Sequence, residues 1–465
     1  MSVPKTKVKP SCPILSDGTS FGTLIDLKRR EVSLRLLEDP EIYQLELERL
    51  WSKTWIIVGH ESEIPKAGDF VRRDIAEDSV IVVRGQDRQI ECLLNVCPHK
   101  GMQVCRVEAG HAPAFRCVYH GFTFGLDGSF RGAPFEKQMY GEIDKSAIRL
   151  RRARVGTFGG LIFANWDPKA PSLDDFLGDF RWYMKAIFDR TPGGIEVLGA
   201  PQRYNIPANW KTASEQFAGD GYHSITLHRS LVDLGFMHGK ESDPKTWGLL
   251  NPKVCTDQGH SVICLDMRDL WGGMALAGQP ALSTLEKLTK LPPAGVPPEM
   301  VNDMVDRFSP EELRVLADTP PSVGGIFPNV AIIAFYVPLP DGVPCATYGI
   351  HQFVPRGPNS FEFIHWNFVA AGASREFRER MQLASNLAVG ASGFVEQDDA
   401  EVFPAQQRSA RGFIGRQSKM RYLALDGPNR PAGWIGGGTV FSGFAKDDTQ
   451  WNWWQRYHRY MTAGA

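Results

Sequence analysis

The chain has 465 residues, a formal net charge of -1 and a composition that is 43% hydrophobic and 11% aromatic. This balance gives no electrostatic reason to expect a nucleic acid or an anionic membrane as partner, and no apolar run reaches the length that spans a bilayer. The length predicts two or three domains. The N-terminal segment has lysines but no apolar stretch of a secretory signal, so we expect a cytoplasmic protein.

The first predicted helix begins near residue 40. Asp39 and Pro40 supply an N-cap and a first-turn proline, and apolar residues follow at helical spacing up to Trp51. From residue 54 to 168 the pattern changes to short alternating segments separated by turns, including an Asp-Gly turn at 127–128. We therefore expect an N-terminal arm and helix, followed by an antiparallel all-β unit.

Two Cys/His pairs fall at strand-to-loop junctions of this all-β unit. Cys97-x-His99 is followed by 17 residues and then by Cys117-x-x-His120. A Rieske-type [2Fe-2S] cluster takes two thiolates on one iron and two imidazoles on the other, and this spacing predicts such a cluster. A structural zinc site suits the same ligands, but the glycine after each pair and the strand-like flanks favour the cluster.

The remaining cysteines predict no disulfide framework. The positions at which an additional thiol could join the two cluster loops hold Met102 and Tyr119. The other six cysteines are scattered and are expected to be buried thiols, as suits a reducing cytoplasm.

Beyond residue 168 the order of elements is mixed. A helix is expected over 171–190, capped by Ser172, and further helices over 374–407 and 451–461. Apolar strand-like segments lie between them at 202–207, 261–267, 324–337, 345–355 and 361–371. This order predicts an α+β region with an antiparallel sheet flanked by helices.

A second metal site is predicted between residues 209 and 230. Asp220 and His223 share one helix face if the preceding helix continues, and His228 requires that helix to end or bend. Two imidazoles can then reach one ion. Lys211 and Arg229 lie near these residues and would match a substrate carboxylate, although solvation at the surface is the expected state.

One carboxylate from elsewhere would complete the facial triad of non-haem Fe(II) oxygenases. The candidates on the predicted helix 374–407 are Glu396, Asp398, Asp399 and Glu401. Adjacent helical residues point about 100° apart, so Asp398 and Asp399 cannot both face the ion. Spacing alone does not choose between them, and a His-x4-His motif often arises by chance. Its coexistence with the Cys/His pairs favours a metal site.

With both motifs in place, the chain resembles the catalytic alpha subunit of Rieske non-haem iron aromatic ring-hydroxylating dioxygenases. The resemblance covers nearly the whole chain and rests on CPHKG, CVYHGFTFGLDGSF, NWKTASEQFAGDGYH and GASGFVEQDDAEVF. It implies an all-β Rieske domain over 54–168 and an α+β catalytic domain over 169–465, on which the arm and helix of residues 1–53 pack.

The resemblance also implies the ligands. Those of one [2Fe-2S] cluster per chain would be Cys97, His99, Cys117 and His120, and those of one mononuclear Fe(II) would be His223, His228 and Asp399. Asp220 would be a bridging carboxylate that accepts hydrogen bonds from His223 and from His120 of a neighbouring copy. Such a head-to-tail contact closes into a ring, so an α3β3 assembly with small beta subunits is expected, with α3 as the alternative.

The implied activity is that of a terminal oxygenase that inserts both atoms of O2 into an aromatic substrate to give a cis-dihydrodiol. The chain has no Gly-rich dinucleotide motif, so electrons from NADH are expected through a separate flavin reductase, with or without a ferredoxin. The alternatives are a Rieske monooxygenase acting on an aromatic acid of salicylate type and a pure Rieske electron carrier.

Motif positions predict the walls of a substrate pocket at Gln216, Phe217, Val232 and Val395, with ordinary core packing as the alternative role. Members of this family that act on naphthalene-like substrates commonly have Asn at the place of Gln216 and Trp at the place of Val395. The smaller Val395 leaves more room near the iron and would suit a larger or differently shaped substrate.

Overall fold

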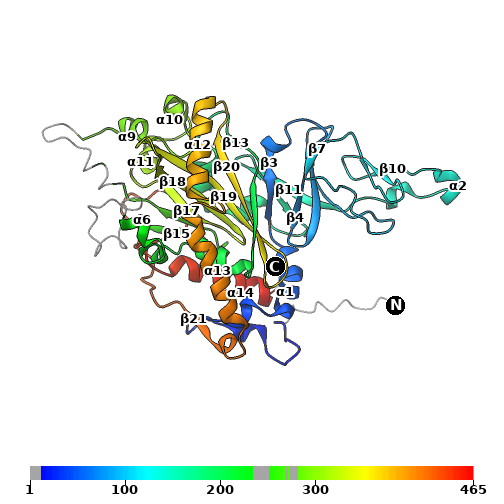
Figure 1. Ribbon diagram of the computed structural model, residues 1–465, viewed down its shortest axis with the longest axis horizontal. Coiled ribbons are helices and arrows are strands. Elements are labelled where there is room, and N and C mark those ends of the chain that lie inside the picture. Colours follow the sequence, from blue (N-terminus) through cyan, green and yellow to red (C-terminus); the bar gives the residue numbers. More distant parts are fainter. Residues whose placement is uncertain (1–11, 234–250, 268–270, 272–280, 464–465) are drawn as a thin grey trace, which may run out of the picture.

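The computed structural model describes residues 12–233, 251–267, 271 and 281–463 (Figure 1). Its β-sheets are antiparallel throughout the described residues, and helices accompany the strands of the C-terminal half. The predicted α+β fold class is confirmed. No helix in the described ranges is long and apolar enough to cross a membrane.

The N-terminal segment pairs with a strand from the C-terminal part of the chain. Asp39 caps the first helix by accepting from the backbone N–H of Glu41, as its sequence predicts, and the helix continues as a short π-helical turn. Its small sheet has the order β1-β2-β21, so strands early and late in the chain pair directly. The bounds are η1 Phe21–Leu24, β1 Ile25–Asp26, β2 Glu31–Ser33, η2 Leu34–Leu37, α1 Pro40–Glu46, η3 Leu47–Trp51 and β21 Lys419–Arg421.

A seven-stranded sheet and a three-stranded sheet form the all-β unit. The larger has the order β3-β12-β11-β6-β5-β4-β7 and the smaller β10-β9-β8. Figure 1 shows β10 and α2 projecting at one end of the molecule. The bounds are β3 Ile56–His60, η4 Glu61–Glu63, β4 Asp69–Ile75, β5 Asp78–Arg84, β6 Ile90–Leu94, β7 Ala109–His111, β8 Phe115–Arg116, β9 Thr123–Phe124, β10 Phe130–Gly132, α2 Glu136–Tyr140, η5 Lys145–Ala147, β11 Arg152–Phe158 and β12 Leu161–Asn165.

A nine-stranded sheet is the centre of the C-terminal half. Its order is β13-β20-β19-β18-β17-β16-β15-β22, with β14 also paired to β20. The segments predicted at 202–207, 261–267, 345–355 and 361–371 each contain one strand, whereas the segment predicted at 324–337 contains parts of two strands that pair with each other. Three further strands, β13, β15 and β22, were not expected. The bounds are β13 Ile195–Val197, β14 Gln202–Ile206, β15 Lys253–Cys255, β16 Ser261–Cys264, β17 Pro321–Ile326, β18 Val330–Pro338, β19 Pro344–Pro355, β20 Phe361–Ala370 and β22 Thr439–Phe441. Figure 1 shows α12 and α13 crossing in front of this sheet.

The helices around the sheet differ from two predictions. The single helix expected over 171–190 is two helices, because Gly178 at φ 48° ends the first one. The helix expected over 374–407 is also two, separated by residues 389–395 with Gly390 at φ 103°. The bounds are α3 Leu173–Leu177, α4 Phe180–Phe188, α5 Trp210–Phe217, η6 Tyr222–Ile225, α6 Arg229–Asp233, α9 Thr284–Lys290, η7 Pro298–Met300, α10 Val301–Val305, α11 Pro310–Asp318, α12 Arg375–Ala388, α13 Glu396–Arg411, η8 Gly415–Gln417 and α14 Asp448–Ala463.

A buried ion pair joins the N-terminal helix to α5. Lys211 Nζ lies 2.5 Å from Glu46 Oε1, and the two side chains are 1% and 0% exposed. Glu46 also accepts from the indole of Trp210 and the hydroxyl of Tyr457 on α14. The expectation that Lys211 is solvated is therefore wrong, whereas Arg229 is exposed as expected.

Removing one member of this pair leaves the other charge buried. Lys211→Met is expected to lower the free energy of unfolding by about 3–5 kcal/mol, and adding Glu46→Gln should recover part of that loss. Arg375→Met, which breaks an exposed pair with Glu379, should change the free energy of unfolding by less than about 1 kcal/mol. Urea denaturation followed by tryptophan fluorescence measures these differences; equal effects of Lys211→Met and Arg375→Met would contradict the prediction.

Candidate metal centres and substrate cavity

The two loops that carry the Cys/His pairs fold alike. In each, the cysteine N–H donates to a carbonyl five residues later, and the N–H of a positive-φ glycine four residues later donates back to the cysteine carbonyl. These bonds join Cys97 to Met102 and Gly101, and Cys117 to Phe122 and Gly121, at 2.8 to 3.0 Å. Each loop therefore presents its cysteine and histidine from one tight turn.

The thiols lie inside the two loops and the imidazoles lie outside. Cys97 and Cys117 are each 2% exposed, whereas His120 is exposed and His99 half-buried. The two imidazole rings are 4.5 Å apart, and His99 stacks on Phe122. The buried Nδ1 of His99 has no hydrogen-bond partner. This donor set fits a cluster whose thiolate-bound iron is buried and whose imidazole-bound iron faces the surface.

The four side chains do not fit a single zinc ion. Tetrahedral zinc at about 2.0–2.3 Å from its ligands would hold all four ligand atoms close together. Among the described residues, the only group of three or more potential ligands whose atoms lie within 4.8 Å of one another is a different one. The cluster-loop residues are therefore spread more widely than mononuclear coordination requires.

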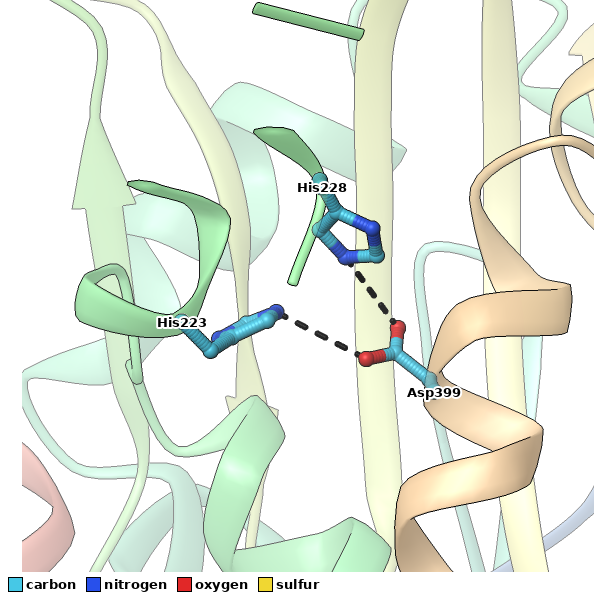
Figure 2. Close-up of side chains that lie close together, drawn as sticks. All are labelled: His223, His228 and Asp399. Atoms are coloured by element: carbon cyan, nitrogen blue, oxygen red, sulfur yellow. Dashed lines mark ion pairs between the residues drawn. The ribbon is translucent and has the colours of Figure 1, made fainter. Parts of the chain in front are cut away.

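That tight group consists of His223, His228 and Asp399 (Figure 2). His223 Nε2 lies 3.6 Å from Asp399 Oδ1, and His228 Nε2 lies 3.6 Å from Asp399 Oδ2. Figure 2 shows both rings directed at the carboxylate, which comes from α13. Two imidazoles and one carboxylate around one point leave room for further ligands on the opposite side.

The histidines converge because α5 ends early. It stops at Phe217, so Asp220 lies in the following turn and His223 in η6, rather than on one continuous helix. Gly219 in this turn has φ 122°, and a Cβ on Gly221 would lie 2.3 Å from the carbonyl oxygen of Phe444. Gly219 is needed for the backbone conformation of the turn, and Gly221 is needed for the close approach of the backbone to Phe444.

Each of the three converging residues lies beside a further polar side chain. The amide of Gln216 donates to Asp399 Oδ1 at 2.7 Å, and His228 Nδ1 lies 3.1 Å from Asp398 Oδ2. Asp220 Oδ2 lies 3.5 Å from His223 Nδ1. The two adjacent acids thus have different places: Asp399 faces both Nε2 atoms, whereas Asp398 lies on the outer side of His228.

The charges at this site favour a cation. Burial opposes ionisation of Asp220, but His223 outweighs it and holds the pKa of the carboxyl below its ordinary value. Burial likewise disfavours the charged imidazoles, yet the nearby carboxylates raise the pKa of His223 and of His228. A raised pKa means that the carboxylates favour protonated imidazoles. A divalent cation bound between the imidazoles and the carboxylates would replace those protons.

A cavity of about 410 Å³ opens onto the His/His/Asp group. Gln216, Phe217 and Val395 line it, while the side chain of Val232 lies outside the described part of the chain. Most of the other lining side chains are apolar, and none of the described ones is lysine or arginine. The volume lies in the range of small-molecule sites.

Sequence patterns did not indicate Glu396 as a wall of this cavity. It is 2% exposed, and burial raises the pKa of its carboxyl well above the ordinary value. His351 and His365 face each other from β19 and β20 beside it, and burial lowers the pKa of His351 to about 3. No sequence spacing signals this contact, because it depends on strand register.

The two predicted iron sites of one chain lie far apart along the molecule. In Figure 1 β10 and α2 lie at the end opposite to α6. His120 is exposed and Asp220 is half-buried.

Comparison with known proteins agrees with this architecture. The family model for the Rieske [2Fe-2S] domain matches residues 54–151, and that for the ring hydroxylating alpha subunit (catalytic domain) matches residues 196–430. The chain is 34% identical over 411 residues to biphenyl dioxygenase subunit alpha of Metapseudomonas furukawaii, covering 85% of this chain and 83% of the relative.

Two further similarities cover more of the chain. It is 31% identical over 454 residues to N,N-dimethyl phenylurea N-demethylase subunit alpha of Sphingobium sp. (strain YBL2), covering 95% of both. Naphthalene 1,2-dioxygenase from Rhodococcus sp. in complex with indole superposes with a TM-score of 0.81 at 32% identity, covering 94% of this chain and 95% of that one.

Proposed function

Because the chain belongs to the alpha subunits of Rieske-type ring-hydroxylating dioxygenases, we propose a specific role for each of its site residues. Cys97, His99, Cys117 and His120 hold the [2Fe-2S] cluster, and His223, His228 and Asp399 hold the mononuclear iron. The convergence of the last three at the base of a largely apolar cavity carries the proposal. We assign the arm to residues 1–53, the Rieske domain to 54–168 and the catalytic domain to 169–465.

The residues around the two centres have distinct tasks. When bound, the cluster supplies single electrons and the ferrous ion activates O2. Gln216 fixes one oxygen of Asp399, and Asp398 fixes the tautomer of His228 by accepting from its Nδ1–H. Apolar lining residues exclude water and orient an aromatic ring against the open side of the His/His/Asp group.

Electron supply involves other chains. Members of this family are subunits of multicomponent enzymes, and we propose an α3β3 ring in which Asp220 meets the exposed His120 of a second copy. The opposite placement of the two sites in one chain supports this contact. A ferredoxin or an NADH-dependent flavin reductase would deliver electrons, and the eight unbridged cysteines suit a cytoplasmic location.

The proposed reaction is insertion of both oxygen atoms into an aromatic ring to give a cis-dihydrodiol. A second candidate is oxidative N-demethylation, which the similarity to the phenylurea N-demethylase subunit favours. The aromatic-acid alternative has less support, since none of the described side chains lining the cavity is a lysine or arginine that could neutralise a substrate carboxylate.

Turnover under ¹⁸O2 distinguishes the two reactions. Purified protein with its beta subunit, a surrogate ferredoxin and reductase, and NADH is given biphenyl or an N,N-dimethyl aryl urea. The proposal predicts a biphenyl cis-dihydrodiol that carries two labelled atoms. Formaldehyde release from the urea without any dihydrodiol would favour the second candidate, and NADH-dependent cluster reduction without O2 consumption would contradict both.

A further inference from the structure

Two described side chains that line the cavity have a buried oxygen without a hydrogen-bond partner: the hydroxyl oxygen of Tyr336 and Oε1 of Glu396. Of these, Glu396 lies beside Asp399 on α13. A buried carbonyl or carboxylate oxygen without a partner costs free energy that a bound donor would recover. The other oxygen, Oε2, lies 3.3 Å from His351 Nε2.

A series of contacts leads from this carboxyl group to the side chains of β19 and β20. His351 Nδ1 lies 2.9 Å from His365 Nδ1, and His365 Nε2 lies 2.6 Å from Asn367 Oδ1. The two rings are 0% exposed, and their backbones are directly paired across β19 and β20. The sheet therefore holds His351 and His365 rigidly. Glu396 cannot turn Oε1 toward these histidines without losing the contact that Oε2 makes with His351.

The acceptor at the last residue of this series, Asn367, determines the direction of the hydrogen bonds between the two histidines. Asn367 Oδ1 can only accept, so His365 Nε2 carries hydrogen, and its Nδ1 accepts from Nδ1–H of His351. His351 Nε2 then has a lone pair 3.3 Å from Glu396 Oε2, although these two atoms form no hydrogen bond. When the carboxyl group is ionised, or carries its hydrogen on Oε2, Oε1 has no hydrogen. It is an acceptor that faces the cavity.

We propose that Glu396 Oε1 accepts a hydrogen bond from the substrate, and that the natural substrate is an aromatic compound bearing an N–H or O–H group on or beside its ring. This inference rests on the proposed function, because it places that substrate in the same cavity. Glu396 is a specificity residue, and His351 and His365 position it.

Three probes of matched shape test the proposal: carbazole, fluorene and dibenzofuran present N–H, CH2 and O at the same place. Equilibrium dialysis under anaerobic conditions, without reductant, measures their dissociation constants for the assembled protein. Carbazole is expected to bind about tenfold more tightly than the other two, the size of one buried hydrogen bond. Equal binding of the three by the wild-type protein would overturn the proposal.

Variants of Glu396 assign the preference to this residue. Glu396→Gln keeps a carbonyl oxygen at the Oε1 position and can donate from its amide to His351 Nε2, so the carbazole preference should remain. Glu396→Leu should abolish the preference, so that carbazole and fluorene bind about equally well. Glu401→Leu, an exposed change on the same helix, should not alter the preference. A preference that survives in Glu396→Leu refutes the proposal. Intact carbazole preference without any dihydrodiol formation would instead count against the proposed function.

Discussion

Replacing Asp399 with alanine is expected to abolish Fe(II) binding at the mononuclear site and to reduce turnover to below about 1% of wild type. Asp399 is 4% exposed, and its two oxygens face the Nε2 atoms of His223 and His228 at 3.6 Å each. Without the carboxylate, the two neutral imidazoles offer neither charge compensation nor the third ligand of a facial triad. Anaerobic titration with Fe(II) and substrate-dependent O2 uptake measure both effects.

Asp398→Ala is the matched control for this variant. Asp398 lies next to Asp399 on α13 but contacts only the Nδ1 side of His228, at 3.1 Å. Its loss should weaken iron binding or activity by about 10- to 100-fold, as expected for a residue that orients a ligand. The cluster spectrum should be unchanged in both variants. If Asp398→Ala abolished Fe(II) binding while Asp399→Ala retained it, the assignment of the ligand would be reversed.

Asp220→Ala is expected to leave both iron centres in place and to slow electron transfer between them by about 10- to 100-fold. Asp220 Oδ2 lies 3.5 Å from His223 Nδ1, and Oδ1 accepts from the backbone N–H groups of Tyr222 and His223. Its carboxylate is thus fixed beside the mononuclear site while remaining half-buried at the surface. Stopped-flow oxidation of the reduced cluster, in the presence of substrate and O2, measures the step.

Two controls separate this effect from general damage. Asp233→Ala removes an exposed carboxylate of α6 that pairs with Arg229 and should behave as wild type. Reduction of the cluster by dithionite should be unchanged in Asp220→Ala, since no contact links Asp220 to the cluster loops of its own chain in the described structure. Normal reoxidation kinetics in Asp220→Ala would show that the carboxylate is not part of the route.

Local chemistry made some features predictable from sequence. The spacing of Cys97, His99, Cys117 and His120 identified a cluster motif because its ligands lie in two short loops. The cap at Asp39 and the longer strands of both sheets followed from local patterns, whereas the three-residue strands β13, β15 and β22 did not; the α+β class followed from the order of the elements. Such features depend on residues close together in the chain.

Features that depend on distant residues were not predictable. The choice between Asp398 and Asp399 depends on how α13 is rotated toward α5 and η6, and Gly390 breaks the helix that was expected to carry both. Burial of Lys211 requires Glu46, which lies 165 residues away. The contact between His351 and His365 depends on the register of β19 with β20, which strand patterns leave open.

The ratio of iron to acid-labile sulfide in the purified protein tests the central claim that one chain holds two separate iron centres. A [2Fe-2S] cluster alone contains equal amounts of both. After anaerobic reconstitution with Fe(II), the wild-type protein should contain one iron per chain in excess of sulfide, and Asp399→Ala should contain none. Equal amounts of iron and sulfide in the reconstituted wild-type protein would contradict the account.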